Sequence, residues 1–289
     1  MNIAKHARVA FQGERGAFSE EAAVKLLGEE ITLVPRPTFE ATFAAINDGV
    51  ADFILAPIEN SLAGSVHRSF DLLVESRLNI LAEVIIPIAH NLIVAPGGSF
   101  EDVEVVESHP VALAQCEQFF SDHPRLKRIA TEDTAGSVRQ VVRAKDRTRA
   151  AIAGKRAAGI YGGVIVREHL EDNRENYTRF LLLSTSPELP EGDSQEKADK
   201  LSLVFQLDHR PGALYHALEP FARRNLNLMK IESRPVHGRP WQYRFYLDLQ
   251  ASQRDPEVTT ALAELEKLVV DLRILGSYPA APTSGDAQS

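Results

Sequence analysis

The stretch Asn176-Tyr177-Thr178-Arg179-Phe180-Leu181-Leu182-Leu183 has the pattern of a buried strand with polar side chains at its start. Its second half is a short apolar run, which indicates a buried strand. Threonine favours strands, and an arginine at a strand end is commonly solvated or ion-paired. The pair Thr178 and Arg179 alone therefore indicates only local structure, and the neighbouring segments decide whether it belongs to a site.

Upstream of this strand, short apolar runs alternate with segments whose apolar residues recur at helical spacing. This alternation indicates β-α units around largely parallel sheets. We expect an α/β domain over residues 8–185. The expected strands are 8–11, 31–34, 52–56, 92–94 and 150–153, and the expected helices are 19–27, 39–47, 110–120 and 135–144.

Residues 186–199 have a different composition, with two prolines, one glycine and few apolar residues around them, and are predicted to be an interdomain linker. Residues 200–278 then show strand alternation, a helical face opened by Pro211, two further strands, a second helical face and a last strand. The order β-α-β-β-α-β predicts a ferredoxin-like module. The tail 279–289 is expected to be disordered.

Composition limits the function classes. The chain has 289 residues, with 44% hydrophobic and 25% charged, which is close to the average of globular proteins and long enough for a sizeable core. The formal net charge is -8 and the lysines and arginines are scattered, which argues against nucleic acid as a partner. A small anionic substrate is compatible with this charge, because a local cationic site can exist in an acidic protein.

Cys116 is the only cysteine, which excludes an intrachain disulfide and a thiolate metal cluster. It lies in a helical pattern, where we expect it to be buried. The first residues, 1–8, lack the apolar core of a signal peptide, and no run approaches about 18 apolar residues. We therefore expect a soluble, cytoplasmic protein that makes no membrane contact.

Four strand-to-helix junctions carry polar residues, at positions where α/β sheets commonly bind ligands. They are Gly13 to Ser19, Glu59 to Val66, Ser108-His109-Pro110, and Glu132 to Gly136, which includes Thr134. From the residues alone, each junction fits an ordinary turn or helix cap as well as a binding loop, and Ser19 and His109 in particular fit a cap.

Two other patterns do not support a cofactor or a metal. The glycines between Gly154 and Gly163 lack the spacing of a nucleotide-phosphate loop, and the junction after Gly13 lacks the dinucleotide fingerprint. His169, among acidic neighbours, has no convincing metal-ligand spacing and is expected at a solvated helix end. We predict no cofactor and no metal.

Several motifs together resemble those of the prephenate dehydratases. They are Asn60-Ser61-Leu62-Ala63-Gly64-Ser65-Val66, Ser108-His109-Pro110, Thr178-Arg179-Phe180 and Glu232-Ser233-Arg234-Pro235. The chain resembles this family from Val9 to about Tyr278. The resemblance implies a catalytic domain of two α/β lobes, similar to periplasmic binding proteins, with the active site in the cleft between the lobes. It also implies a regulatory ACT domain that follows the catalytic domain in the sequence. It also implies that the chain crosses between the lobes near His90 and returns near Thr178.

The implied reaction converts prephenate to phenylpyruvate with loss of carbon dioxide and water, in phenylalanine biosynthesis. Aromatisation drives it, so a cofactor is unnecessary. The resemblance implies that Thr178 assists the departure of the hydroxyl group, either by protonating it or by orienting it through a hydrogen bond. Arg179 would neutralise a carboxylate. The remaining substrate contacts are assigned to Asn60, Ser61, Gly64, Ser65, Phe180, His109, Thr134 and Ser19, the last because Ala17 stands where many bacterial members have threonine.

In the regulatory module, the resemblance assigns phenylalanine binding to Gly212, Ala213 and Leu214 and to Glu232, Ser233, Arg234 and Pro235. Such modules pair side by side, so a homodimer or homotetramer with feedback inhibition by phenylalanine is expected. Two other readings stay open. An arogenate dehydratase performs the same elimination on the amino-acid analogue of prephenate, and a catalytically silent amino-acid sensor would share the fold, although an intact Thr178 and Arg179 argue against it.

Overall fold

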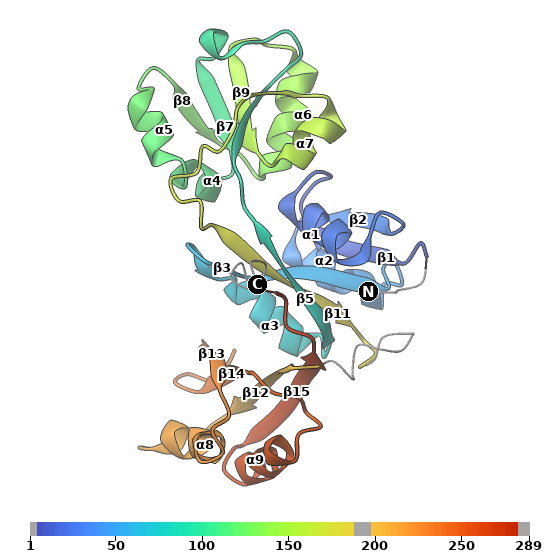
Figure 1. The fold of residues 1–289 in the computed structure, drawn as a ribbon, viewed down its shortest axis with the longest axis vertical. Coiled ribbons are helices and arrows are strands. Elements are labelled where there is room, and N and C mark those ends of the chain that lie inside the picture. Colours follow the sequence, from blue (N-terminus) through green and yellow to red (C-terminus); the bar gives the residue numbers. More distant parts are fainter. Residues whose placement is uncertain (1–4, 188–197, 283–289) are drawn as a thin grey trace. The chain divides into compact units, whose positions relative to one another are not determined.

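The computed structural model describes residues 5–187 and 198–282 (Figure 1). These residues fall into two compact units. One unit comprises residues 5–69 with 84–180, and the other comprises residues 70–83 with the described part of 181–289. The strands β5 (Asn79–Pro87) and β11 (Tyr177–Ser184) and the helix α3 (His67–Glu75) run from one unit into the other. The middle of the predicted linker, 188–197, and the end of the predicted tail, 283–289, lie outside the described residues.

The first lobe is built on β1 (Arg8–Gln12), which pairs in parallel with β2 (Thr32–Arg36) and with β3 (Phe53–Asn60). The helices α1 (Phe18–Leu27) and α2 (Phe39–Asn47) connect these strands. The sheet order is β2-β1-β3-β11-β5, with the short β4 (Gly64–Ser65) folded back on the end of β3. The strands β1 and β3 are largely buried on both faces, which explains their continuous apolar runs.

The second lobe has a sheet of order β10-β6-β9-β7-β8. Its elements are β6 (Asn91–Val94), η1 (Phe100–Asp102), β7 (Val105–Ser108), α4 (Pro110–Ala114), α5 (Glu117–Asp122), β8 (Lys127–Ala130), α6 (Thr134–Ala144), β9 (Arg149–Ala153), α7 (Lys155–Tyr161) and β10 (Val164–Arg167). Alternate residues of its strands face opposite sides: Leu92 and Ile152 pack with α4 and α5, whereas Ile93 and Ala151 pack with α6 and α7. Helices therefore cover both faces of this sheet.

The chain passes from the first sheet to the second after β5 and returns before β11. The two crossing segments contact each other, because the Ile88 backbone N–H donates to the Asn176 carbonyl at 2.7 Å. The predicted crossings near His90 and Thr178 are confirmed, and so is the two-lobed α/β class.

The predicted helix over 110–120 is wrong in one respect, because it is broken at Gln115 and Cys116. The backbone N–H groups of Glu117 and Gln118 donate to the carboxylate of Asp172, at 2.9 Å each, which starts a separate helix α5. Cys116 lies at this break and is fully buried. The expected helix end at His169 is also wrong: this segment is a loop, His169 has a φ of 56°, and Glu171 is buried.

The other unit contains a four-stranded antiparallel sheet of order β13-β14-β12-β15. Its elements are β12 (Lys200–Gln206), α8 (Ala213–Ala222), β13 (Leu228–Pro235), β14 (Tyr243–Leu249), α9 (Pro256–Glu266) and β15 (Asp271–Tyr278). Inward residues of the strands pack with Phe221 of α8 and Leu265 of α9 in one core. The predicted β-α-β-β-α-β order is confirmed.

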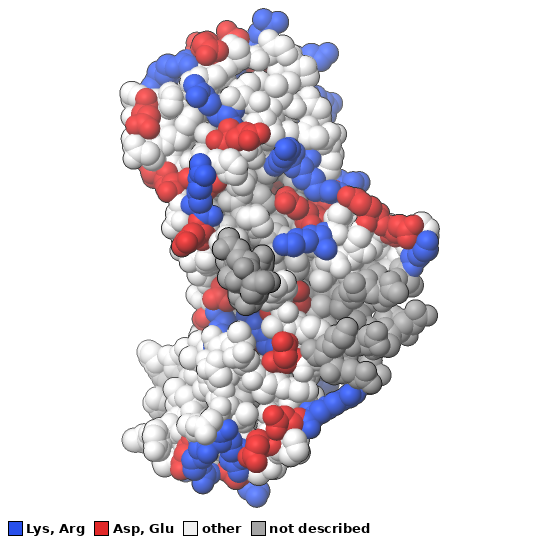
Figure 2. Space-filling view, viewed as in Figure 1, with Lys and Arg blue, Asp and Glu red and all other residues white. Residues whose placement is uncertain are grey.

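Lysine and arginine side chains are interspersed with aspartate and glutamate on the face of the molecule that Figure 2 shows. This distribution agrees with the scatter of basic residues along the sequence. No helix of the described residues is long and apolar enough to span a membrane.

Candidate active site

Thr178 lies in β11, where alternate side chains face opposite sides of the strand. Thr178 is 8% exposed and Phe180 is 2% exposed, whereas the alternate residues Tyr177 and Arg179 are half-buried. Thr178 and Arg179 therefore point to different sides. Arg179 Nη1 lies 3.8 Å from the Glu59 carboxylate, which is on the neighbouring strand β3.

Asn60, the last residue of β3, holds the Thr178 hydroxyl. Its side-chain Nδ2 donates to Thr178 Oγ1 at 3.0 Å, to Asn176 Oδ1 at 2.7 Å and to the Tyr177 carbonyl at 3.1 Å. Its Oδ1 accepts from the backbone N–H groups of Leu62 and Ala63, at 3.0 and 2.8 Å, which fixes the amide orientation. Because Thr178 Oγ1 accepts from Asn60, the hydroxyl keeps its own hydrogen to donate elsewhere.

This hydrogen-bonded chain continues through three residues from separate segments. The buried Asn176 donates through Nδ2 to Gln115 Oε1 at 3.0 Å, and His90 Nε2 lies 2.9 Å from the same oxygen. Gln115 is at the break between α4 and α5, and His90 is on the crossing segment between β5 and β6. Our sequence reasoning assigned no site role to these three residues, because no local motif relates them.

Ser61 secures the start of β11. Its Oγ donates to the Glu175 carbonyl at 2.8 Å and accepts from the Tyr177 backbone N–H at 2.9 Å. Gly64 and Ser65 form β4, the returning arm of a tight hairpin with β3, and Gly64 has a φ of +82°, a conformation that favours glycine. The predicted Asn60 to Ser65 group is therefore one hairpin, and its contacts with substrate stay a prediction.

His109 and Thr134 lie at the carboxyl ends of the adjacent parallel strands β7 and β8. His109 caps α4, because its Nδ1 accepts from the Val111 backbone N–H at 3.2 Å. Burial lowers the pKa of His109, and the nearby Asp133 carboxylate opposes this shift. Asp133 caps α6 by accepting from the Gly136 backbone N–H at 2.6 Å, and Thr134 is the first residue of that helix. His109 is thus a cap, and a neutral imidazole is favoured there.

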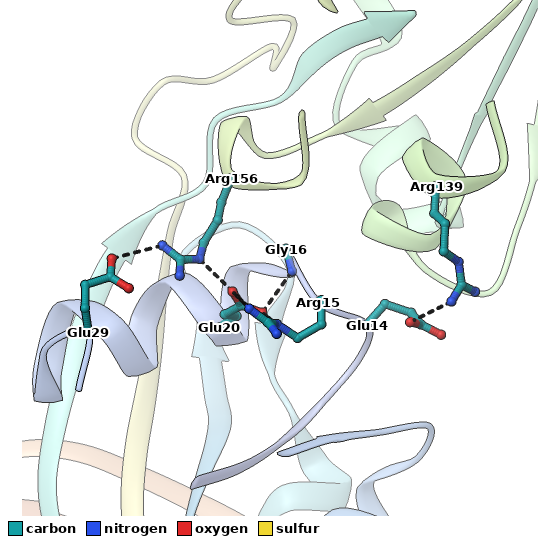
Figure 3. Close-up of polar contacts among 7 residues, drawn as sticks. All are labelled: Glu14, Arg15, Gly16, Glu20, Glu29, Arg139 and Arg156. Atoms are coloured by element: carbon teal, nitrogen blue, oxygen red, sulfur yellow. Dashed lines mark hydrogen bonds and ion pairs between the residues drawn. The ribbon is translucent and has the colours of Figure 1, made fainter. Parts of the chain in front are cut away.

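The loop after β1 contacts the second lobe (Figure 3). Glu20 of α1 is fully buried and accepts hydrogen bonds from Arg15, from Arg156 of α7 and from the Gly16 backbone N–H, at 2.7, 2.9 and 3.0 Å. Gly16 has a φ of +86°, and a Cβ there would lie 2.7 Å from the backbone of Ala157, so the approach of the loop to α7 requires glycine.

Ser19 is not the cap of α1, as one reading of the sequence had it. The cap position is Ala17, and Ser19 is buried inside the first turn. Glu14 pairs with Arg139 of α6 at 3.0 Å, so a second ion pair joins this loop to the other lobe. A cavity of about 170 Å³ lies among the ends of β1 and β2 and the β8–α6 loop, lined by Gln12, Gly13, Glu14, Pro35, Arg36, Pro37, Glu132 and Asp133.

In the other unit, Gly212 starts α8 in the left-handed conformation, with a φ of 77°. Ala213 and Leu214 line a cavity of about 120 Å³, together with aromatic residues that include Trp241 and Phe245. The register of β13 with β14 puts Ser233 on the same side as Phe245, and Glu232 on the side of Tyr246.

Arg234, from the second predicted phenylalanine motif, is engaged by α3. Its Nε and Nη2 donate to the two carboxylate oxygens of Asp71, at 3.2 and 2.9 Å, and donating these hydrogen bonds to the carboxylate raises the pKa of Arg234. The same face carries Tyr246, whose hydroxyl donates to the Phe70 carbonyl at 2.9 Å. Among the described residues, no group of His, Cys, Asp and Glu side chains is arranged to hold a metal ion.

Comparison with known proteins agrees with this architecture. Residues 9–188 match the family model described as prephenate dehydratase, and residues 202–267 match the ACT domain model. The chain is 42% identical over 281 residues to chloroplastic arogenate dehydratase/prephenate dehydratase 2 of Arabidopsis thaliana, covering 94% of this chain and 72% of that protein.

Two solved structures are also similar over nearly the whole chain. The prephenate dehydratase of Arthrobacter aurescens in complex with L-Phe has 31% identity and a TM-score of 0.85, covering 97% of this chain and 91% of that one. GqqA, described as a novel type of quorum-quenching acylase, has 33% identity and a TM-score of 0.85, covering 95% of this chain and 98% of that one.

Proposed function

Because the chain belongs to the prephenate dehydratase family, a family of lyases, we propose that it converts prephenate to phenylpyruvate with loss of carbon dioxide and water. The observation that supports this assignment most is the hydrogen bond from Asn60 Nδ2 to Thr178 Oγ1, at 3.0 Å. It orients a hydroxyl donor inside a nearly buried site, as the departure of a hydroxyl group requires.

The proposed step breaks two bonds of prephenate. The bond between the ring and its carboxylate breaks to release carbon dioxide, and its electron pair moves into the ring as the opposite carbon–oxygen bond breaks. The departing hydroxide takes up a proton from the solvent and leaves as water. Thr178 Oγ1 donates the hydrogen bond that stabilises this hydroxide, and aromatisation makes the elimination favourable. A threonine hydroxyl is a weak acid, so we assign it orientation and stabilisation rather than complete proton transfer.

Arogenate is the alternative substrate. The Arabidopsis relative is named for both activities. Prephenate has a keto group where arogenate has an ammonium group. The hydroxyl that Thr178 serves is common to both, so the same geometry supports either reaction.

An acylase activity, as described for GqqA, has less support here. A hydroxyl nucleophile needs an adjacent base to take its proton. The Thr178 hydroxyl accepts from the side-chain amide of Asn60, which is a hydrogen-bond donor and not a base. A silent amino-acid sensor is likewise disfavoured, because it would need no oriented hydroxyl.

We also propose that the ACT domain binds phenylalanine and inhibits the reaction. The L-Phe complex of the Arthrobacter relative and the cavity beside Ala213 and Leu214 support this. The strand β13 is at the edge of its sheet and exposes 46% of Met229 and of Ile231, which supports pairing of two such domains in a dimer or tetramer. The domain limits 8–185 and 200–278 and a cytoplasmic location stay predictions of the sequence.

Steady-state assays of the purified protein test the function directly. Phenylpyruvate formation from prephenate and phenylalanine formation from arogenate are measured in parallel, with and without added phenylalanine. Turnover of prephenate supports the main proposal, turnover of arogenate alone supports the alternative, and no turnover of either contradicts both. Inhibition by phenylalanine that is absent in a Gly212→Val variant supports the regulatory assignment.

A further inference from the structure

His90 is the end of the hydrogen-bonded chain that leads to Thr178, and it is only 2% exposed. Its backbone is held on both sides: its N–H donates to Glu171 Oε2 at 2.7 Å, and its carbonyl accepts from the Leu170 N–H at 2.8 Å. The ring of Phe18 packs edge-on against the imidazole, with the ring centroids 5.8 Å apart. The imidazole is therefore held in place on the crossing segment between β5 and β6, against Phe18 of α1.

The hydrogen bonds along this series of side chains determine which atom of each residue donates. Asn60 Nδ2 donates to Asn176 Oδ1, so Asn176 presents Nδ2 to Gln115. Gln115 Oε1 therefore accepts from Asn176, and His90 Nε2, 2.9 Å from the same oxygen, must donate to it. Burial lowers the pKa of His90, outweighing the hydrogen bond to Gln115, which favours the neutral ring. The neutral ring then carries its hydrogen on Nε2, and within the described residues its buried Nδ1 has no hydrogen-bond partner.

Two donors on Gln115 Oε1 leave the amide only one satisfactory orientation. If the amide flipped, its NH₂ group would face two N–H donors, and donors left without an acceptor in a buried site are unfavourable. The oxygen is thus committed to Asn176 and His90, which fixes the orientation of the Gln115 amide. Without the donor of His90, only Asn176 would oppose a flip.

We propose that His90 is a positioning residue for the elimination and acts through Gln115. Its Nε2–H fixes the orientation of the Gln115 amide. Through Asn176, the Gln115 amide in turn fixes the orientation of the Asn60 amide, whose N–H donates to Thr178. This inference rests on the proposed function, because it concerns the same site. It assigns a role to a histidine that touches neither Thr178 nor the reacting atoms.

The activity test compares the wild type with His90→Leu, His90→Gln, Gln115→Ala and the double variant His90→Leu/Gln115→Ala. Leucine fills the space without a donor, whereas glutamine offers an N–H where Nε2 lay. We expect His90→Leu to lower kcat about 10- to 100-fold with a smaller change in KM, and His90→Gln to restore most of the activity. In the Gln115→Ala background, His90→Leu should cause no further loss, because the residue acts through Gln115.

A matched control is His123→Leu, because His123 is a half-buried histidine of the second lobe whose Nδ1 binds the Phe119 carbonyl. It should keep wild-type activity. Equal losses in His90→Leu and His90→Gln, or losses that add in the double variant, would indicate a structural role and overturn the inference. An inactive wild type overturns the proposed function and the inference with it, whereas an active wild type that His90→Leu leaves unchanged overturns the inference alone.

A second readout does not depend on activity. Nitrogen-15 spectra of protein labelled at its nine histidines, with His90 assigned by its loss in His90→Gln, report the tautomer directly. We expect the Nε2–H tautomer at neutral pH. A spectrum of the Nδ1–H tautomer would contradict the hydrogen-bond assignment on which the inference rests.

Discussion

At the scale of single residues, the candidate site depends on which atoms donate and which accept. The side-chain oxygen of Asn60 accepts a hydrogen bond within its own hairpin, and its nitrogen donates to Thr178 Oγ1. The threonine hydroxyl therefore acts as an acceptor towards Asn60 and retains its hydrogen for the substrate. A residue of the same shape that cannot donate would reverse this arrangement. The direction of one hydrogen bond thus decides whether Thr178 serves the leaving hydroxyl.

Asn60→Asp tests that direction with little change in volume. The new carboxylate accepts only, so the Thr178 hydroxyl would turn its hydrogen towards it and away from substrate. We expect kcat to fall at least about 10²-fold, within the range that placed proton donors contribute. Asn227→Asp is the matched control, because Asn227 Nδ2 binds Gln250 at an exposed position, and it should leave kcat unchanged. Equal activity of the two variants would exclude the proposed role of Asn60.

The sequence alone predicted part of this site. Thr178, Asn60 and Ser61 were assigned because their short motifs next to strand ends resemble those of the prephenate dehydratases. Gln115, Asn176 and His90 were not assigned, because their relation arises only when a helix break and two crossing segments meet. Arg179 was placed with Thr178 as a neighbour in sequence, although strand alternation turns the two side chains to opposite sides.

At the scale of elements, α1 and α7 are joined by a buried carboxylate. Glu20 is fully buried, and burial raises its pKa, but the hydrogen bonds from Arg15, Arg156 and Gly16 outweigh this and leave the pKa below its ordinary value. The charged form is therefore the stable one in the folded protein. An ion pair of this kind is informative mainly when one partner is removed.

Glu20→Gln removes the charge and leaves two arginines facing a neutral amide. Because Arg15 and Arg156 keep 48% and 24% of their side chains exposed, water moderates the penalty, and we expect a loss of about 1–3 kcal/mol in the free energy of unfolding. Glu29→Gln is the control, since Glu29 contacts the same Arg156 at 3.5 Å but is 74% exposed, and its loss should be within about 0.5 kcal/mol. Denaturant unfolding measures both.

The pH dependence of the same variant has a defined sign. A carboxyl whose folded-state pKa is lowered stabilises the fold above its unfolded pKa of about 4.3, and this contribution disappears as pH falls through the folded-state pKa. The difference in unfolding free energy between wild type and Glu20→Gln should therefore be constant near neutral pH and shrink below about pH 4. A difference that grows on acidification would contradict the lowered pKa.

The elements themselves were largely predictable, with one instructive exception. The strands and helices of the ferredoxin-like module followed from strict alternation and helical spacing, which local sequence determines. The break between α4 and α5 did not, because the group that starts α5 is the Asp172 carboxylate, distant in sequence. Helical periodicity continues through the break, so only the tertiary partner reveals it.

At the scale of the whole molecule, one of the two compact units combines the ACT domain with part of α3 and part of β5. Contacts within this unit include the buried ion pair of Lys200 with Glu83, at 2.9 Å, and the partly buried pair of Arg234 with Asp71. Helix α3 begins at His67, two residues after the hairpin that contains Asn60. Under the proposed regulation, a change at Arg234 would reach Asp71 through their ion pair and then follow the backbone of α3 to the hairpin that holds Thr178.

Asp71→Asn tests this route. It removes the charge that Arg234 pairs with, and we expect the phenylalanine concentration for half-maximal inhibition to shift at least about threefold while kcat without phenylalanine changes little, since coupling energies are typically about 1–3 kcal/mol. Asp122→Asn, at an exposed position of α5, is the matched control. An unchanged phenylalanine response in Asp71→Asn would show that this ion pair carries no part of the coupling.

The central claim is that the Thr178 hydroxyl serves the departing hydroxyl group, and kcat of Thr178→Val and Thr178→Ser on the better of the two substrates tests it most directly. Valine keeps the shape of threonine without the hydroxyl, whereas serine keeps the hydroxyl. The account predicts a loss of about 10²–10⁴ in kcat for Thr178→Val, as for Thr178→Ala, and a much smaller loss for Thr178→Ser. A folded Thr178→Val protein with near wild-type kcat would contradict the claim.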